Sequence, residues 1–289
     1  MTEWQELTLR TAHPEALGEI LEACGALAVT FKDAADDPVL EPLPGQTPLW
    51  PDTLVVGLFD GTDNRAQIEE SLHRGGGEWI VGAHWDELPE QVWERAWLAH
   101  FRPMNFGDRL RVAPHDATVP DDGRVTLRLD PGLAFGTGTH PTTALCLHWL
   151  GSQDLRGRRV LDYGCGSGIL AVASARLGAI PVVACDIDPQ AEQATRDNAL
   201  RNGVDVRIVP CIAPVATPFD IVIANILAGT LISLADPLVA RLQRGGQLLL
   251  SGLLCAQAAA VRAAYPALDF TELTQDGWSL LVGVHKSHD

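Results

Sequence analysis

The amino-acid sequence predicts a two-domain α/β protein, and two observations carry this prediction. From about residue 101 onward, apolar strand-like runs alternate with helical segments, which is typical of a parallel sheet covered by helices on both faces. Residues 1–88 show fewer elements and indicate a smaller α+β domain. At 289 residues the chain is long enough for both cores. We therefore predict domains at 1–88 and 103–289, joined by a linker helix at 89–102.

The first domain is predicted to follow the order βαββαβ, which suggests a ferredoxin-like sandwich with both helices on one face of an antiparallel sheet. Its second and third strands are separated by residues 34–51, which contain five prolines. A loop this long in a small domain is usually functional or mobile. The predicted strands are Trp4–Thr11, Leu27–Phe31, Asp52–Phe59 and Trp79–Trp85, and the predicted helices are His13–Cys24 and Arg65–Leu72.

The linker helix carries an aromatic stripe. Trp93, Trp97 and Phe101 recur every four residues, so all three lie on one helical face. Packing of this face onto a neighbouring domain is the expected role.

The second domain is predicted to alternate strands and helices from residue 124 to its end. The Asp276-Gly277 pair between the last two strands is a hairpin signal, so one antiparallel strand should join the otherwise parallel sheet. The predicted strands are Arg124–Leu129, Arg159–Tyr163, Pro181–Ile187, Val206–Cys211, Phe219–Ala224, Gln247–Ser251, Phe270–Leu273 and Ser279–Val284. The predicted helices are Pro141–Leu150, Ile169–Leu177, Gln190–Asn202, Leu227–Leu242 and Cys255–Ala264.

The net charge of −16 argues against nucleic acid as a direct partner, because phosphate binding needs a basic surface. Residues 1–100 hold 19 acidic and 5 basic side chains, whereas the rest of the chain holds 18 and 16. The acidity of the first domain has two interpretations: a charge that keeps the protein soluble, or a docking surface for a basic macromolecule.

The remaining composition predicts a cytoplasmic protein without metal. The six cysteines are scattered and none forms a Cys-x-x-Cys pair, so we expect reduced thiols and no zinc site. The N-terminus shows no signal peptide, and no apolar run is long enough to span a membrane.

A glycine-rich turn is the strongest chemical signal. Asp162 ends a predicted strand, Gly164, Gly166 and Gly168 follow at every second position, and a helix begins. A dinucleotide fingerprint would need its last glycine where Ile169 stands. A carboxylate beside this turn would repel a pyrophosphate but attract a cation. S-adenosylmethionine carries a sulfonium and an ammonium group and no phosphate, so it is the predicted cofactor.

Two further strand ends carry polar side chains at the same predicted edge. Asp186 follows the next strand, where a carboxylate accepts hydrogen bonds from ribose hydroxyls. Asp188, which precedes Pro189, is better explained as a helix cap. Asn225 ends the Phe219–Ala224 strand among apolar residues, and its amide oxygen could accept a hydrogen bond from an incoming amine.

These residues together resemble a class I S-adenosylmethionine-dependent methyltransferase, whose fold is a Rossmann-like, seven-stranded and mostly parallel sheet closed by an antiparallel hairpin. Three longer segments are similar to the PrmA family of bacterial ribosomal protein methyltransferases, and the resemblance covers nearly the whole chain. They are the loop Asp130–Thr143, the segment Asp186–Ala191 and the segment Ala224–Ala228.

The resemblance implies which residues contact the cofactor. The matching positions are Thr143, Gly164, Asp186 and Asn225. The loop that contains Phe135 and Thr137 would close over the methionine end of the cofactor, while Gly166 and Asp162 belong to the glycine turn. Asn225 is the predicted catalytic residue. His140 is expected to start the helix at Pro141 rather than to act as a catalytic base.

The resemblance also implies a reaction. Members trimethylate lysine ε-amines and the N-terminal α-amine of the large-subunit ribosomal protein numbered eleven, which the first domain binds. We expect a monomer acting on that basic protein free of the ribosome. The alternatives are methylation of another protein or a small amine, a nicotinamide dehydrogenase, a nucleic-acid methyltransferase and a non-enzymatic binding module.

Overall fold

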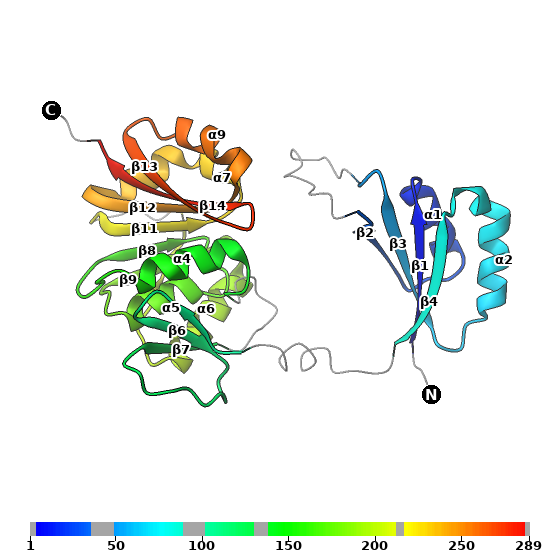
Figure 1. The fold of residues 1–289 in the computed structure, drawn as a ribbon, viewed down its shortest axis with the longest axis horizontal. Coiled ribbons are helices and arrows are strands. Elements are labelled where there is room, and N and C mark those ends of the chain that lie inside the picture. Colours follow the sequence, from blue (N-terminus) through cyan, green and yellow to red (C-terminus); the bar gives the residue numbers. More distant parts are fainter. Residues whose placement is uncertain (1–3, 36–48, 89–101, 130–137, 212–216, 287–289) are drawn as a thin grey trace. The chain divides into compact units, whose positions relative to one another are not determined.

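The computed structural model describes residues 4–35, 49–88, 102–129, 138–211 and 217–286. It divides the chain into two compact units, residues 1–96 and 97–289. Each unit is built on a sheet of its own (Figure 1). The predicted linker helix lies almost wholly outside the described residues, as do most of the proline-rich loop and the 130–137 segment.

The first unit is a four-stranded antiparallel sheet, in the order β2-β3-β1-β4, with two helices packed against it. The predicted order βαββαβ is confirmed, although the fourth strand begins three residues later than expected because a short 3₁₀ turn occupies Gly77–Trp79. The ferredoxin-like classification stays a prediction. The elements are β1 (Trp4–Thr11), α1 (Pro14–Ala23), β2 (Ala28–Asp33), β3 (Thr53–Asp60), α2 (Arg65–Gly76) and β4 (Gly82–Leu88).

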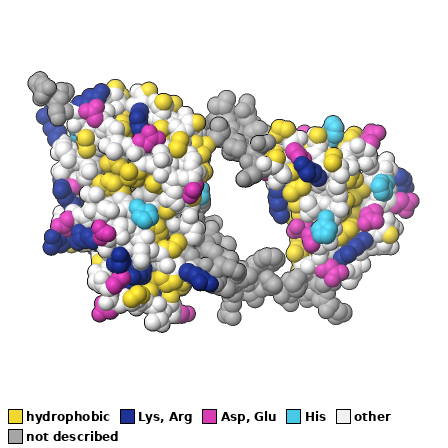
Figure 2. All heavy atoms as spheres, in the orientation of Figure 1, with side chains coloured by type: hydrophobic (Ala, Val, Ile, Leu, Met, Phe, Trp, Pro, Cys, Tyr) yellow, Lys and Arg dark blue, Asp and Glu magenta, His cyan; other side chains and the backbone are white. Residues whose placement is uncertain are grey.

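The core of this unit follows from alternation along its central strands. Leu7 and Leu9 of β1 lie on the sheet face that meets the helices, where Leu17 and Leu21 of α1 pack against them. The intervening residues Glu6, Thr8 and Arg10 point to the other face. Acidic and basic side chains are interspersed on the side of this unit that Figure 2 shows.

The second unit contains the large sheet. Strands β10, β9, β8, β11 and β12 run parallel, β14 joins antiparallel to β12, and β13 closes the edge. The predicted mostly parallel, seven-stranded sheet with a closing hairpin is therefore confirmed. Its strands are β8 (Val160–Tyr163), β9 (Val182–Cys185), β10 (Arg207–Ile208), β11 (Phe219–Asn225), β12 (Leu242–Leu254), β13 (Leu268–Gln275) and β14 (Trp278–His285).

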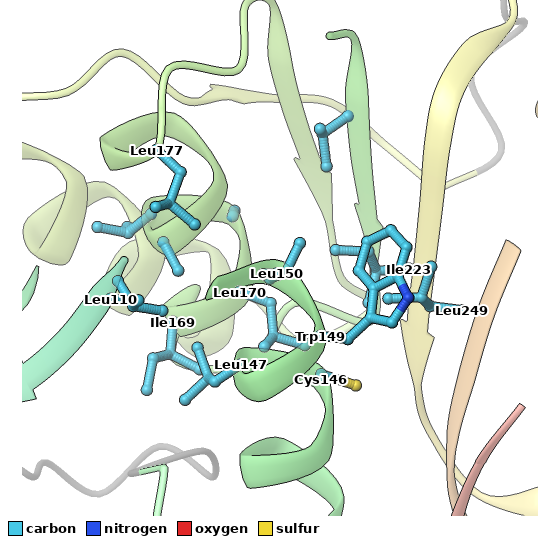
Figure 3. Packing of buried hydrophobic residues seen from close by; sticks show 14 of the residues in the cluster. Leu110, Cys146, Leu147, Trp149, Leu150, Ile169, Leu170, Leu177, Ile223 and Leu249 are labelled. Atoms are coloured by element: carbon cyan, nitrogen blue, oxygen red, sulfur yellow. The ribbon is translucent and has the colours of Figure 1, made fainter. Parts of the chain in front are cut away.

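Helices bury both faces of this sheet. Val160 of β8 joins one apolar cluster and its neighbour Leu161 joins the other, as expected for a strand buried on two sides. Figure 3 shows the first cluster, in which α4 and α5 side chains such as Leu147 and Leu170 pack with the sheet residue Ile223. The helices are α4 (Pro141–Gly151), α5 (Ile169–Arg176), α6 (Pro189–Arg201), α7 (Ala228–Ser233), α8 (Ala235–Arg241) and α9 (Ala258–Ala263), the last preceded by a 3₁₀ turn at Cys255–Gln257.

Two parts of the second unit differ from the sequence prediction. The single helix expected at Leu227–Leu242 is two helices, which break at Leu234. Pro237 explains the break, because it lacks an N–H group for the carbonyl of Ser233 and its ring crowds that carbonyl. A separate small sheet of β5 (Met104–Phe106), β6 (Leu110–Ala113) and β7 (Val125–Arg128) was not predicted apart from its last strand.

Within the described part of the chain, no helix is both long and apolar enough to cross a membrane. The same residues hold no group of three or more histidine, cysteine or acidic side chains placed to bind a metal ion. All six cysteines are free thiols.

Candidate active site

A pocket of about 780 Å³ opens at the carboxyl edge of the parallel strands. Its wall comes mainly from the carboxyl ends of β8, β9 and β11 and from the start of α4, and α7, β12 and β14 also contribute. This edge is where open α/β sheets bind ligands, and the volume suits a small molecule. Residues from the predicted site that line the pocket are Gly164, Gly166, Asp186 and Asn225.

The glycine turn after β8 brings bare backbone to the pocket. Gly164 has φ +78°, and a Cβ built on it would lie 2.4 Å from Cγ2 of Ile226. Gly168 has φ +75°, and its Cβ would lie 2.6 Å from Oγ1 of Thr195. Both the left-handed backbone and the close packing require glycine at these positions. The predicted turn is thus a backbone cradle, in which an added side chain at Gly164 or Gly168 would clash with Ile226 or Thr195.

Asp186 is held at the pocket by two backbone groups. Its Oδ2 accepts a hydrogen bond from Gly166 N–H at 2.9 Å, and its Oδ1 accepts one from Asp188 N–H at 3.0 Å. The carboxylate is therefore fixed in orientation, and its remaining lone pairs are available to further donors. Asp188 itself caps α6, since its side chain accepts from Gln190 N–H at 2.8 Å, as predicted.

Asp162 lies beneath the glycine turn and does not line the pocket. Its side chain is fully buried, its Oδ2 accepts from Ala171 N–H at 3.0 Å, and its Oδ1 has no partner. Ala171 is in the first turn of α5, whose own cap residue Gly168 has no side chain to satisfy it. Asp162 therefore replaces the missing cap. Burial, with a smaller contribution from the charge of Asp186, raises the pKa of Asp162 to about 7.

Asn225 reaches the pocket from the end of β11 and is tied to α4. Its Nδ2 donates to Oγ1 of Thr143 at 3.2 Å. Thr143 is buried and does not line the pocket; its neighbour Thr142 does. With Nδ2 directed at Thr143, the amide oxygen of Asn225 is left as the acceptor for a ligand. A direct bond from Thr143 to the cofactor stays a prediction.

The start of α4 forms a second wall. The ring of His140 accepts a hydrogen bond from Thr142 N–H through Nδ1 at 3.3 Å, so His140 is the helix cap that the sequence predicts. Its ring stands edge-on to Trp278, with centroids 4.7 Å apart. Burial lowers the pKa of His140, which favours the neutral imidazole.

The sequence prediction missed several pocket residues. Trp278, which begins β14, is far from the other site segments in sequence, and only the pairing of β14 with β12 brings it to this edge. Ile187 directly follows Asp186, and Leu227 lies two residues after Asn225; both add exposed apolar surface to the pocket. Because they are so close in sequence to predicted site residues, they could have been identified from the sequence. Phe135 and Thr137 lie outside the described residues.

Comparison with known proteins places this arrangement in a family. The family model for ribosomal protein L11 methyltransferase (PrmA) matches residues 3–286, which include both units. The chain belongs to this family. Its relatives include the ribosomal protein L11 methyltransferase of Methylococcus capsulatus, 49% identical over 98% of this chain and 100% of that protein. The enzyme of Ectopseudomonas mendocina is 47% identical over 97% of this chain and 98% of that protein.

A solved structure agrees with the family assignment. A ribosomal protein L11 methylase from Lactobacillus delbrueckii subsp. bulgaricus is 32% identical, with a TM-score of 0.60 over 65% of this chain and all of that one. PrmA enzymes are S-adenosylmethionine-dependent methyltransferases, so this chain is one. Its pocket fits such a cofactor, because the glycine turn lines it with backbone, and the described lining residues include the carboxylate of Asp186 but no arginine or lysine.

Proposed function

We propose that this chain transfers methyl groups from S-adenosylmethionine to lysine ε-amines and the N-terminal α-amine of ribosomal protein L11, up to the trimethylated state. The observation that carries the proposal is the family match over residues 3–286, which includes the first unit as well as the pocket-bearing one. A fold shared with methyltransferases would support methyl transfer alone, whereas a match over both units supports the same protein substrate.

The cofactor is proposed to bind along the β8 and β9 ends of the pocket. Gly164 and Gly166 would give it backbone contact, Asp186 would accept from its ribose hydroxyls, and Ile187 would cover its base. Asp162 supports this turn from below, where its side chain accepts a hydrogen bond from Ala171 N–H at the start of α5. Phe135 and Thr137 are proposed to close over the methionine end.

The amine is proposed to bind at Asn225, whose amide oxygen would accept a hydrogen bond from it and direct its lone pair. The bound cofactor supplies a methyl carbon made electrophilic by the sulfonium. For an amine to attack, it must first lose a proton, which at pH 7 costs about 4.6 kcal/mol for a lysine and about 1 kcal/mol for an α-amine. A nearby positive sulfur lowers the amine pKa, so no strong base is required. Alignment and exclusion of water are the tasks left to the protein.

The first unit is proposed to recognise the protein substrate, and its acidic excess suits a lysine-rich partner. We further propose that the enzyme is a cytoplasmic monomer that acts on L11 before it joins the ribosome. Methylation of another protein or of a small amine is the alternative, because the same pocket would serve any aliphatic amine.

Mass spectrometry of intact L11 tests the proposal. Purified unmethylated L11 is incubated with S-adenosylmethionine and the enzyme, and the masses of the products are recorded. We expect stepwise gain of methyl groups that ends in trimethylated amines, and a gain about 100-fold slower with the Asn225→Ala enzyme. An unchanged L11 mass with an enzyme that binds S-adenosylmethionine would refute L11 as the substrate and leave the alternative.

A further inference from the structure

Two aromatic rings stand together on one side of the pocket. His140 comes from the start of α4 and Trp278 from the start of β14, and their rings meet edge-on with centroids 4.7 Å apart. Trp278 is only half-buried, so part of its surface faces the pocket that it lines. Neither the glycine turn nor Asp186 contributes to this side.

The backbone beneath these rings is held by Ser251 of β12. Its Oγ lies 3.1 Å from the carbonyl oxygen of Thr142 and 3.2 Å from the carbonyl oxygen of Ser279. Thr142 is two residues after His140, and Ser279 directly follows Trp278. Ser251 is fully buried, and its strand partner across the β11–β12 ladder is Asn225. The buried side chain of Ser251 thus connects the start of α4 with the start of β14. It does so beside Asn225, at the end of β11.

Near Asn225, the surface suited to a cation is the aromatic side of the pocket, formed by His140 and Trp278. Asp186 is the one carboxylate among the described residues that line the pocket, and it follows β9, two strands away from β11. A third aromatic residue, Tyr163, already has the guanidinium of Arg241 over its ring at 5.6 Å. Among the described residues, no guanidinium or ammonium group lies over the ring of Trp278.

Repeated methylation changes what an amine can bind. Each transfer forms a C–N bond and breaks the C–S bond of the sulfonium, whose sulfur keeps the electron pair as a thioether. The first two products lose a proton to solvent before the next attack, and the third is a quaternary ammonium. Each methylation therefore removes one N–H donor from the amine, so its hydrogen bonding to the amide oxygen of Asn225 weakens. The attraction of a methylated ammonium to an aromatic face persists.

From this geometry we propose that Trp278, braced by His140, is the wall against which the partly methylated amine packs, so that Trp278 sets how far methylation proceeds. This inference rests on the proposed methylation of amines and adds a residue that determines the degree of methylation. Because burial favours the neutral form of His140, that ring adds no positive charge opposite the ammonium.

Trp278→Leu and Trp278→Phe enzymes test the proposal on two substrates, unmethylated L11 and L11 whose target amines are already dimethylated. Mass spectrometry follows the mono-, di- and trimethylated fractions. We expect the leucine enzyme to retain most of its first-transfer rate but to lose about ten-fold on the dimethylated substrate, and phenylalanine to restore most of it. Tyr163→Leu is the matched aromatic control, and we expect it to slow all transfers equally.

Calorimetry of S-adenosylmethionine binding and thermal melting show whether the Trp278 variants remain folded. Equal slowing of every transfer by Trp278→Leu in a folded enzyme would overturn the proposal, as would normal trimethylation by it. If wild-type enzyme leaves L11 unmodified, the proposed substrate fails. In that case, the same variants are compared on a small primary amine and its dimethyl derivative, and the same difference between them is expected.

Discussion

The two sides of the pocket are built by different means. On the β8 and β9 side, the surface is mostly backbone: a turn with left-handed glycines, and a carboxylate held by two N–H groups. On the β11 and β14 side, the surface is made of side chains, with Asn225 held by Thr143 and Trp278 held against His140. Because a backbone cradle tolerates no added atoms while a side-chain wall can lose one group at a time, mutations should affect the two sides differently.

The largest effect is expected from Gly164→Ala. The new methyl group would lie 2.4 Å from Ile226 in a backbone at φ +78°, so we expect no measurable S-adenosylmethionine binding by calorimetry. Gly157→Ala is the matched control, since Gly157 has φ +72° but no atom within 4 Å of the added carbon. That variant should lose only about 1–2 kcal/mol of stability from the backbone strain and bind cofactor normally. Equal affinity in the two variants would contradict a backbone-made cofactor side.

Asn225→Ala should separate the two sides of the pocket. We expect methyl transfer to fall about 100-fold, because the amine loses its alignment, while cofactor affinity changes little. Turnover assays and calorimetry on the same preparation measure both. Equal losses in the two quantities would mean that Asn225 serves cofactor binding rather than the amine.

The contrast between the sides also explains what the sequence could predict. Glycine spacing and an acid at the next strand end are local patterns with a physical cause, so Gly164, Gly166 and Asp186 could be placed at the pocket from sequence. Trp278 could not, because nothing local relates a residue after a hairpin turn to a loop before α4. The burial of Asp162 was also missed: its position at a strand tip did not tell whether its side chain points to the pocket or under the turn.

The fold, like the site, could be predicted where the sequence has a local pattern and not elsewhere. Element order followed from apolar periodicity, since each strand and helix has its own pattern in sequence. The break between α7 and α8 was missed although Pro237 marks it, and the strands β5 and β6 are too short, at three and four residues, to show a period.

Thr143→Val tests how the Asn225 side is held. Valine has the shape of threonine but cannot accept the hydrogen bond from Nδ2 of Asn225. We expect the turnover number to fall about ten-fold with unchanged cofactor affinity, and Thr143→Ser to restore it. A loss of cofactor affinity instead would support the direct contact between Thr143 and the cofactor that the family resemblance implies.

Asp162→Asn should have the smallest effect on methyl transfer, because its side chain lies below the pocket surface, and its main effect should be on stability. The raised pKa of about 7 means that the folded chain holds the Asp162 proton more tightly than the unfolded chain does. The stabilisation from this group is therefore fully present below the unfolded pKa, near 4, and is lost as the pH rises to about 7. Asparagine cannot ionise, so the stability of the variant relative to wild type should rise over the same interval, as measured by urea unfolding at several pH values. A constant difference from pH 4 to 7 would show that the buried carboxylate is already ionised, and that the cofactor side has a fixed negative charge beneath its glycine turn.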